Sequence, residues 1–172
     1  MIKKTNIALI GMPGAGKSTV GRLLADRLAM NFYDTDTLIE QDHNSGLQEI
    51  LDKVGYLKLR EFEEQAILSR QFSGSVIATG GSVIYGAAAL AQLKPNCSFF
   101  YLHASIPTLQ ARINNWPDRG IASPIGQSFD DLYAERSPLY EQYADHQIPA
   151  DSQDAEAIAE QIAGIYLSNA AD

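Results

Sequence analysis

Cysteine is nearly missing from this sequence, since Cys97 is the only one among 172 residues. An intrachain disulfide is therefore excluded, and the apolar run 97–102 around this residue is typical of a buried strand rather than of a reactive thiol. Long apolar runs are missing as well, because none approaches the length that a membrane-spanning helix needs. We therefore expect a cytoplasmic protein without a membrane partner.

Basic residues are scarce in the second part of the chain, where residues 95–172 hold three arginines, no lysine and eleven acidic residues. Residues 1–94 are balanced, so the whole net charge of −8 comes from the second part. This distribution argues against nucleic acid as a partner. The three arginines, Arg112, Arg119 and Arg136, either face a polyanionic ligand or pair with surface carboxylates, and charge alone leaves both readings open.

What the chain does have is a phosphate-binding loop near its N-terminus. Residues 11–18, GMPGAGKS, fit the motif G-x-x-x-x-G-K-[ST] at every fixed position, between a strand-like run and a helical apolar pattern. Glycines let backbone amides surround a phosphate, Lys17 reaches the β- and γ-phosphates, and the Ser18 hydroxyl ligates Mg²⁺. The alternative is a glycine-rich turn without a ligand. We expect ATP and Mg²⁺ as cofactors, with ATP bound by Gly14, Ala15, Gly16, Lys17, Ser18 and Thr19.

Apolar runs and helical patterns alternate along the rest of the chain. Strands are expected at 7–10, 32–36, 75–79, 97–102 and 147–149. Helices are expected after Lys17 and at 37–43, 47–54, 57–70, 86–93, 105–114, 128–143 and 154–167, with an interruption near Pro138 left open. This alternation is typical of one α/β domain, here residues 1–172, whose parallel sheet is covered on both faces and binds ligands beyond the carboxyl ends of its strands.

Two carboxylates follow the second expected strand. Asp34 and Asp36 are two residues apart, so in extended chain they share a side and face the crevice at the strand ends. Beside a magnesium–nucleotide complex, one can hold the metal while the other accepts the proton of an attacking hydroxyl. Alternatively, one of them caps the helix that is expected to begin at Thr37.

Two further features can each be interpreted in two ways. Gly80-Gly81 follows the third expected strand, and it either lets a ligand approach the backbone or forms an ordinary tight turn. Arg60 lies on an expected helix, where a solvated pair with Glu64 is the structural alternative to binding an anion.

Several segments form one recognisable set. They are GMPGAGKST at 11–19, FYDTD at 32–36, Gly55 with Arg60 and Glu63, VIATGG at 76–81, and ERSPLY at 135–140. This set resembles the shikimate kinase family, small phosphate-loop enzymes similar to nucleoside-monophosphate kinases. The resemblance implies a three-layer α/β/α fold with a five-stranded parallel sheet, a substrate-binding region at about 37–65, and a mobile lid at about 115–127.

The resemblance also implies an activity, the ATP-dependent phosphorylation of a ring hydroxyl on a small hydroxylated carboxylic acid. Shikimate is the first candidate, which would place the protein in aromatic amino acid biosynthesis. Lys17, Asp36 and Arg119 are the implied catalytic residues, with Asp36 binding the hydroxyl as a base or orienter. Asp34 would support Mg²⁺, Arg112 would lie against the adenine, and Arg119 would contact the phosphates from the lid.

The same resemblance implies an acceptor pocket. Arg60 and Arg136 would hold the substrate carboxylate, as bidentate guanidinium chemistry allows. Gly80 and Gly81 would contact the acceptor through the backbone, beside Asp36.

The chain departs from the usual family pattern at several places. Ser82 stands where a third glycine is usual, Leu59 where phenylalanine is usual, and Tyr56 where glutamate is usual. Residues 118–122, DRGIA, stand where the lid usually carries Arg-Pro-Leu-Leu. The alternatives are therefore a kinase for gluconate or another hydroxylated acid, and a nucleotide-binding regulator without catalysis. A monomer is expected.

Overall fold

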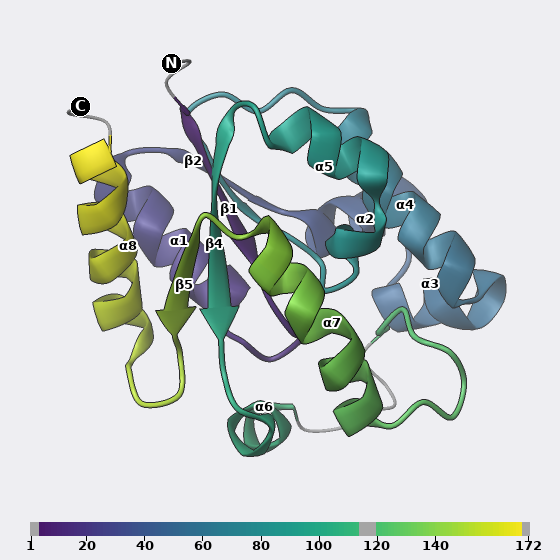
Figure 1. Ribbon diagram of the computed structural model, residues 1–172. Coiled ribbons are helices and arrows are strands. Elements are labelled where there is room, and N and C mark those ends of the chain that lie inside the picture. Colours follow the sequence, from purple (N-terminus) through teal and green to yellow (C-terminus); the bar gives the residue numbers. More distant parts are fainter. Residues whose placement is uncertain (1–3, 114–119, 170–172) are drawn as a thin grey trace.

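The computed structural model describes residues 4–113 and 120–169 (Figure 1). At its centre is a five-stranded sheet in the order β2-β3-β1-β4-β5, in which all neighbouring strands are parallel. The strands are β1 Asn6–Ile10, β2 Asn31–Asp34, β3 Ser75–Ala78, β4 Cys97–His103 and β5 His146–Pro149. This sheet confirms the α/β fold that the alternating pattern predicts.

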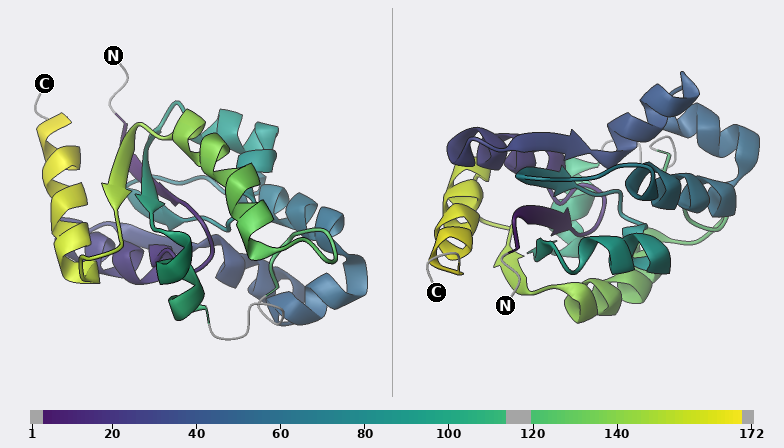
Figure 2. Two further views of the ribbon diagram at one scale, coloured as in Figure 1. Left: turned by 60° about the horizontal axis from the view of Figure 1, so that its bottom comes forward. Right: turned by 90° about the horizontal axis from the view of Figure 1, so that it is seen from above.

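Helices cover both faces of the sheet. Figure 2 shows α1 and α8 together on one face and α5 and α7 on the other, while α2, α3 and α4 pack on one another at the side. The helices are α1 Lys17–Leu28, α2 Thr35–His43, α3 Leu47–Val54, α4 Tyr56–Leu68, α5 Ala87–Leu93, α6 Ile106–Arg112, α7 Phe129–Tyr143 and α8 Ala155–Asn169, with a short 3₁₀ helix, η1 Val83–Tyr85. In the described ranges, no helix has the length and apolar character needed to cross a membrane.

Two hydrophobic cores hold these layers together. In the larger one, β1 and β3 are buried along their whole length, as expected for parallel strands covered on both faces. Cys97 is buried in this core, as its apolar surroundings predict. A smaller core joins the group of α2, α3 and α4 to the chain after α6, through Ile39, Ile50, Leu59, Ala66 and Ala122. It thereby fixes Ala122 beside the carboxyl ends of the strands.

The predicted element boundaries lie within two residues of those observed. Two features were left open or missed by the prediction. The interruption that was left open near Pro138 does not occur. Helix α7 runs through it, because Leu132, Leu139 and Tyr140 pack against the core and offset the hydrogen bond that proline cannot donate. The 3₁₀ helix η1 was not predicted, since three residues are too few to show a period.

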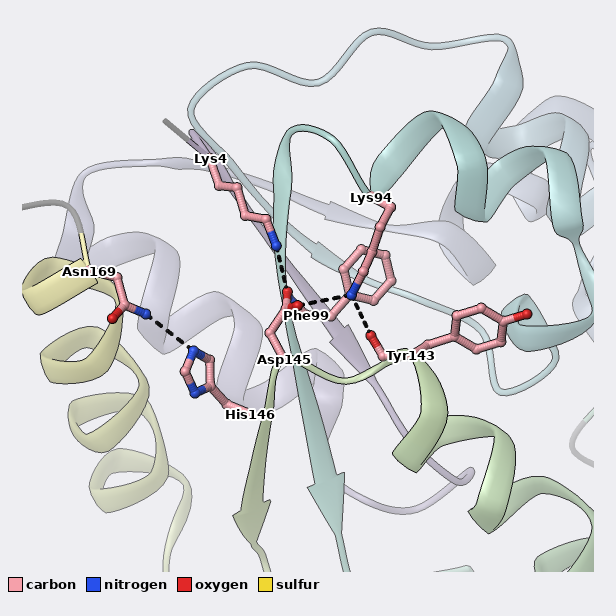
Figure 3. Close-up of polar contacts among 7 residues, drawn as sticks. All are labelled: Lys4, Lys94, Phe99, Tyr143, Asp145, His146 and Asn169. Atoms are coloured by element: carbon pink, nitrogen blue, oxygen red, sulfur yellow. Dashed lines mark hydrogen bonds and ion pairs between the residues drawn. The ribbon is translucent and has the colours of Figure 1, made fainter. Parts of the chain in front are cut away.

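An ionic cluster closes the amino-terminal end of the sheet, opposite the phosphate loop (Figure 3). Asp145, just before β5, accepts hydrogen bonds from Lys4 Nζ at 2.8 Å, Lys94 Nζ at 2.9 Å and the amide of Phe99 at 2.9 Å. Lys94 also donates to the carbonyl of Tyr143 at 2.8 Å. The cluster therefore joins the starts of β1, β4 and β5 to the ends of α5 and α7.

Candidate active site

A cavity of about 410 Å³ opens at the carboxyl ends of the strands. Its wall combines the phosphate loop, the start of α2, the turn after β3, part of α7 and residues 120–122. These segments meet because parallel strands all end at the same edge of the sheet. The predicted crevice is therefore present, and it receives side chains from parts of the chain that are far apart in sequence.

The phosphate loop leads directly from β1 into α1. Gly16 has φ +96° and precedes the first residue of α1, so the backbone turns in a conformation that glycine tolerates best. A Cβ atom on Gly14, at φ +81°, would lie 2.7 Å from Ile113 Cγ1. Ser18 and Thr19 follow in the first turn of α1, exposed in the cavity wall. This arrangement directs the helix N-terminus at the cavity, as anion binding requires.

Lys17 lies beneath this loop. Its Nζ atom donates to the carbonyls of Gly11 and Met12, each at 2.8 Å, and only 9% of the residue is exposed. Burial lowers the pKa of Lys17 to about 8, although the negative charges of Asp36 and Asp34 act to raise it. Ala15 is buried outside the cavity wall, and its amide donates to the carbonyl of Met12 at 3.1 Å.

The two aspartates reach the cavity in a different way from the one predicted. Asp34 ends β2 and caps α2, since its Oδ1 atom accepts from the amides of Asp36 at 3.1 Å and Thr37 at 3.4 Å. Asp36 therefore lies in the first turn of α2, and the expectation of a shared side in extended chain was wrong. Both residues still line the cavity, because the strand ends and the helix begins at its rim.

Asp36 carries one buried carboxylate oxygen, Oδ1, that has no hydrogen-bond partner among the described residues. Burial raises the pKa of Asp36 to about 6, the negative charge of Asp34 adds to this shift, and Lys17 opposes it. A carboxylate with a raised pKa and a free oxygen is suited to accepting a proton near neutral pH.

The diglycine after β3 lies directly against charged side chains. A Cβ atom on Gly80 would lie 2.8 Å from Asp36 Oδ1 and 2.9 Å from Glu63 Oε1, and one on Gly81 would lie 2.9 Å from Arg136 Nη1. The backbone can approach these groups only because neither position has a side chain. Gly81 also lines the cavity, whereas Gly80 is buried and is not part of its wall, so contact of a ligand with either backbone stays a prediction.

Arg60 from α4 and Arg136 from α7 converge on one oxygen. The carbonyl of Ala122 accepts from Arg60 Nε at 3.2 Å, Arg60 Nη2 at 3.0 Å and Arg136 Nη2 at 2.8 Å. Arg136 lines the cavity, is 1% exposed, and its Nε atom has no partner in the described part of the chain. Arg60 does not line the cavity itself, but it donates hydrogen bonds to Ala122, which does. The alternative pair of Arg60 with Glu64 is wrong, because Glu64 accepts from backbone amides at the start of α5.

Glu63 belongs to the segments that resemble the shikimate kinase family, but no role for it was predicted from the sequence. Glu63 is 5% exposed in the cavity wall and accepts a hydrogen bond from Ser82. Burial raises the pKa of Glu63 to about 8, with the charge of Asp36 adding and that of Arg136 opposing. The sequence could have predicted that Glu63 faces the same way as Arg60, because it lies three residues later and so on the same side of the helix.

The remaining predicted residues divide between the described and undescribed parts of the chain. Arg112, at the end of α6, lines the cavity and donates from Nη2 to the carbonyl of Ala150 at 2.8 Å. Arg119 lies outside the described residues, as does the first part of the predicted lid at 115–127. Within that lid, Gly120 donates from its amide to Gln48 Oε1 at 2.6 Å.

The geometry agrees with comparisons to known proteins. A family model described as "Shikimate kinase" matches residues 13–165. A shikimate kinase of Vibrio vulnificus is 36% identical over 165 residues, which cover 94% of this chain and 96% of that protein. The structure of the shikimate kinase from Acinetobacter baumannii in complex with shikimate superposes with a TM-score of 0.83 at 32% identity, covering 95% of this chain and 93% of that one.

The chain belongs to the shikimate kinase family. Shikimate kinase from Aquifex aeolicus also superposes, with a TM-score of 0.79 at 26% identity over 96% of this chain and 98% of that one. Membership of the shikimate kinase family identifies the chain as an ATP-dependent phosphotransferase that acts on a hydroxyl group. The cavity brings the phosphate loop together with the side chains of Asp36, Glu63 and Arg136.

Proposed function

We propose that the protein transfers the γ-phosphoryl group of ATP to a ring hydroxyl of shikimate. One observation carries the acceptor side of this proposal. A buried acceptor atom, Asp36 Oδ1, and a buried donor atom, Arg136 Nε, are both unpaired among the described residues, and their side chains line the same cavity as Lys17. Since unpaired buried polar atoms are costly, they favour a ligand that brings both a hydroxyl and an anionic group.

In this proposal Asp36 accepts the hydrogen bond of the attacking hydroxyl, and Arg136 with Arg60 holds the carboxylate. The carbonyl of Ala122 accepts from both guanidinium groups, and the acceptor carboxylate would take its place. Gly81 leaves its part of the cavity wall free of a side chain, and Gly80 behind it leaves room for the carboxylates of Asp36 and Glu63. Bidentate pairing with a planar carboxylate is the chemistry for which arginine is best suited.

On the nucleotide side, the backbone amides of residues 14–19 cradle the phosphates and Lys17 stabilises the charge of the transferring group. Arg112 would lie against the adenine, and Arg119 remains a predicted phosphate contact. Lys17 is well placed for its role, because it is buried beside the loop and close enough to Asp36 for the two charges to interact.

Magnesium fits the donor set of the same cavity. The Ser18 hydroxyl and the Asp34 carboxylate both line it, and hard oxygen donors are what Mg²⁺ prefers. No group of three or more His, Cys, Asp or Glu side chains that could hold a metal occurs among the described residues, which suits an ion held mainly by phosphates and water. When bound, Mg²⁺ would neutralise phosphate charge.

The direct test is ADP release measured with a panel of acceptors. Shikimate should support Lys17-dependent ADP release, and phosphorus NMR should show a phosphomonoester on the shikimate ring. Gluconate, quinate and a neutral polyol serve as the comparison acceptors. ADP release with gluconate or a polyol but not with shikimate would overturn the acceptor assignment, and binding of ATP without any acceptor-dependent turnover would favour a regulator. The monomeric state and the cytoplasmic location remain predictions, to be tested by sedimentation and cell fractionation.

A further inference from the structure

Tyr85 lies beside both arginines of the acceptor pocket. It ends η1, the short 3₁₀ helix after the diglycine, and its ring centroid is 3.8 Å from Arg60 Cζ and 5.5 Å from Arg136 Cζ. A second tyrosine, Tyr56, lies 5.1 Å from Arg60 Cζ. Tyr85 is therefore in contact with a guanidinium from α4 and close to another from α7, although neither helix contains it.

The Tyr85 ring is held in place from its hydroxyl end. That hydroxyl donates to Glu135 Oε1, and Glu135 also accepts from Gln127 Nε2 at 2.7 Å. Glu135 directly precedes Arg136 in α7. Because the hydroxyl is anchored on α7 while the ring face contacts Arg60 on α4, Tyr85 fixes the two helices that supply the arginines relative to each other.

An aromatic ring has a particular advantage in orienting a guanidinium group. A carboxylate partner binds the N–H groups at the edge of the guanidinium, whereas a ring stacks on its face and leaves that edge free. Among the described residues, Arg60 donates side-chain hydrogen bonds only to the carbonyl of Ala122. The two positive charges also repel each other, and the electron-rich ring face offsets part of that repulsion.

We propose that Tyr85 is a positioning residue for the acceptor. Its ring face orients Arg60 and Arg136 without occupying their N–H donors, so an anionic group can replace the Ala122 carbonyl that these donors contact. This inference rests on the proposed function, since it requires that the two arginines bind the acceptor. It concerns a residue that contacts the guanidinium groups rather than the reacting atoms, so its removal should weaken acceptor binding and leave the chemical step nearly intact.

The test compares variants at position 85 in the full chain, with KM for shikimate, KM for ATP and kcat measured separately. Tyr85→Leu removes the aromatic face and should raise the shikimate KM about tenfold, on the scale of one partly buried cation–π contact, with kcat and the ATP KM within about twofold of wild type. Tyr85→Phe keeps the face and should retain most of the affinity. Tyr166→Leu is the matched control, because Tyr166 is another half-buried tyrosine with a bonded hydroxyl, on α8.

A double-mutant cycle separates stacking from general loosening of the fold. Tyr85→Leu should add little to the acceptor KM of Arg60→Ala, because the stacked partner is already gone. If Tyr85→Leu fails to fold, a fluorinated phenylalanine at position 85 keeps the shape while weakening the ring face, and it should raise the shikimate KM relative to Tyr85→Phe.

The outcomes distinguish this inference from the proposed function. If Arg136→Ala and Arg60→Ala raise the shikimate KM but Tyr85→Leu does not, only the role of Tyr85 is overturned. Equal losses in Tyr85→Leu and Tyr85→Phe would assign the effect to the hydroxyl and Glu135, and would also overturn stacking. If neither arginine variant changes the acceptor KM, the proposed acceptor pocket itself is wrong, and the inference for Tyr85 fails with it.

Discussion

The two sides of the cavity are built by different means. The proposed nucleotide side is a continuous segment, residues 11–19, which offers backbone amides and one lysine to the phosphates. The acceptor side takes single side chains from separate elements, with Asp36 from α2, Glu63 from α4 and Arg136 from α7. A local motif can therefore specify the nucleotide side, whereas the acceptor side exists only when the core packs these helices correctly.

The largest effect should come from the nucleotide side. Lys17→Ala removes the charge that stabilises the transferring phosphoryl group, and we expect turnover to fall by about two orders of magnitude or more. Steady-state assays with saturating ATP and shikimate measure this loss, and Lys58→Ala serves as a surface-lysine control. Near wild-type turnover in a folded Lys17→Ala protein would contradict the assignment of the phosphate loop.

Asp36 lies where the two sides meet, and Asp36→Asn should separate them. Turnover should fall by about 10²-fold or more, because the amide cannot accept the proton, while ATP affinity measured by calorimetry stays near normal. If ATP affinity is lost while acceptor turnover remains, Asp36 belongs to the nucleotide side.

The pH dependence provides a separate check on Asp36. Its pKa is raised to about 6, and the base is active only when ionised. On the acid side, the rate should therefore fall as the pH drops through about 6, rather than near 4 as for an exposed aspartate. A kcat/KM profile in shikimate measures this limb, and a flat profile down to pH 5 would contradict the prediction.

On the acceptor side, Arg136→Ala should raise the shikimate KM by about 10- to 100-fold, as expected for loss of a buried charge-assisted hydrogen bond. Shikimate with a neutral amide in place of its carboxylate should bind the wild type much more weakly. In the Arg136→Ala protein, the amide should raise the acceptor KM little further, because the arginine that would bind the carboxylate is already missing. Equal penalties in the two proteins would remove Arg136 from the acceptor pocket.

The contrast between the two sides also explains what the sequence could predict. The loop at 11–18 and the order of strands and helices follow from local patterns, and the structure agrees with them. The helix start at Thr35 was missed because the capping contact of Asp34 depends on the geometry at the end of β2. The convergence of Arg60 and Arg136 on Ala122 could not be seen, since it joins residues 62 and 14 positions apart. The stacking of Tyr85 has no sequence signal for the same reason.

The smallest effect should come from the far end of the sheet, which contributes to stability rather than to either side of the cavity. Burial works against ionisation of Asp145, but hydrogen bonds from Lys4, Phe99 and Lys94 outweigh it and hold its pKa below the usual value. A carboxylate with a lowered pKa stabilises the fold fully above its unfolded-state pKa, near 4, and the contribution is lost as the pH falls through its folded-state pKa.

Asp145→Asn should therefore lower the free energy of unfolding by about 1 kcal/mol at pH 7, a modest figure because both lysines are partly exposed and screened. The difference from wild type should shrink below about pH 4, when the wild-type carboxylate is itself protonated. Urea unfolding at several pH values measures this, while kcat and both KM values should stay at wild type. A loss of acceptor affinity in Asp145→Asn would show that the two ends of the sheet are coupled, so that this ionic cluster would contribute to the site as well as to stability.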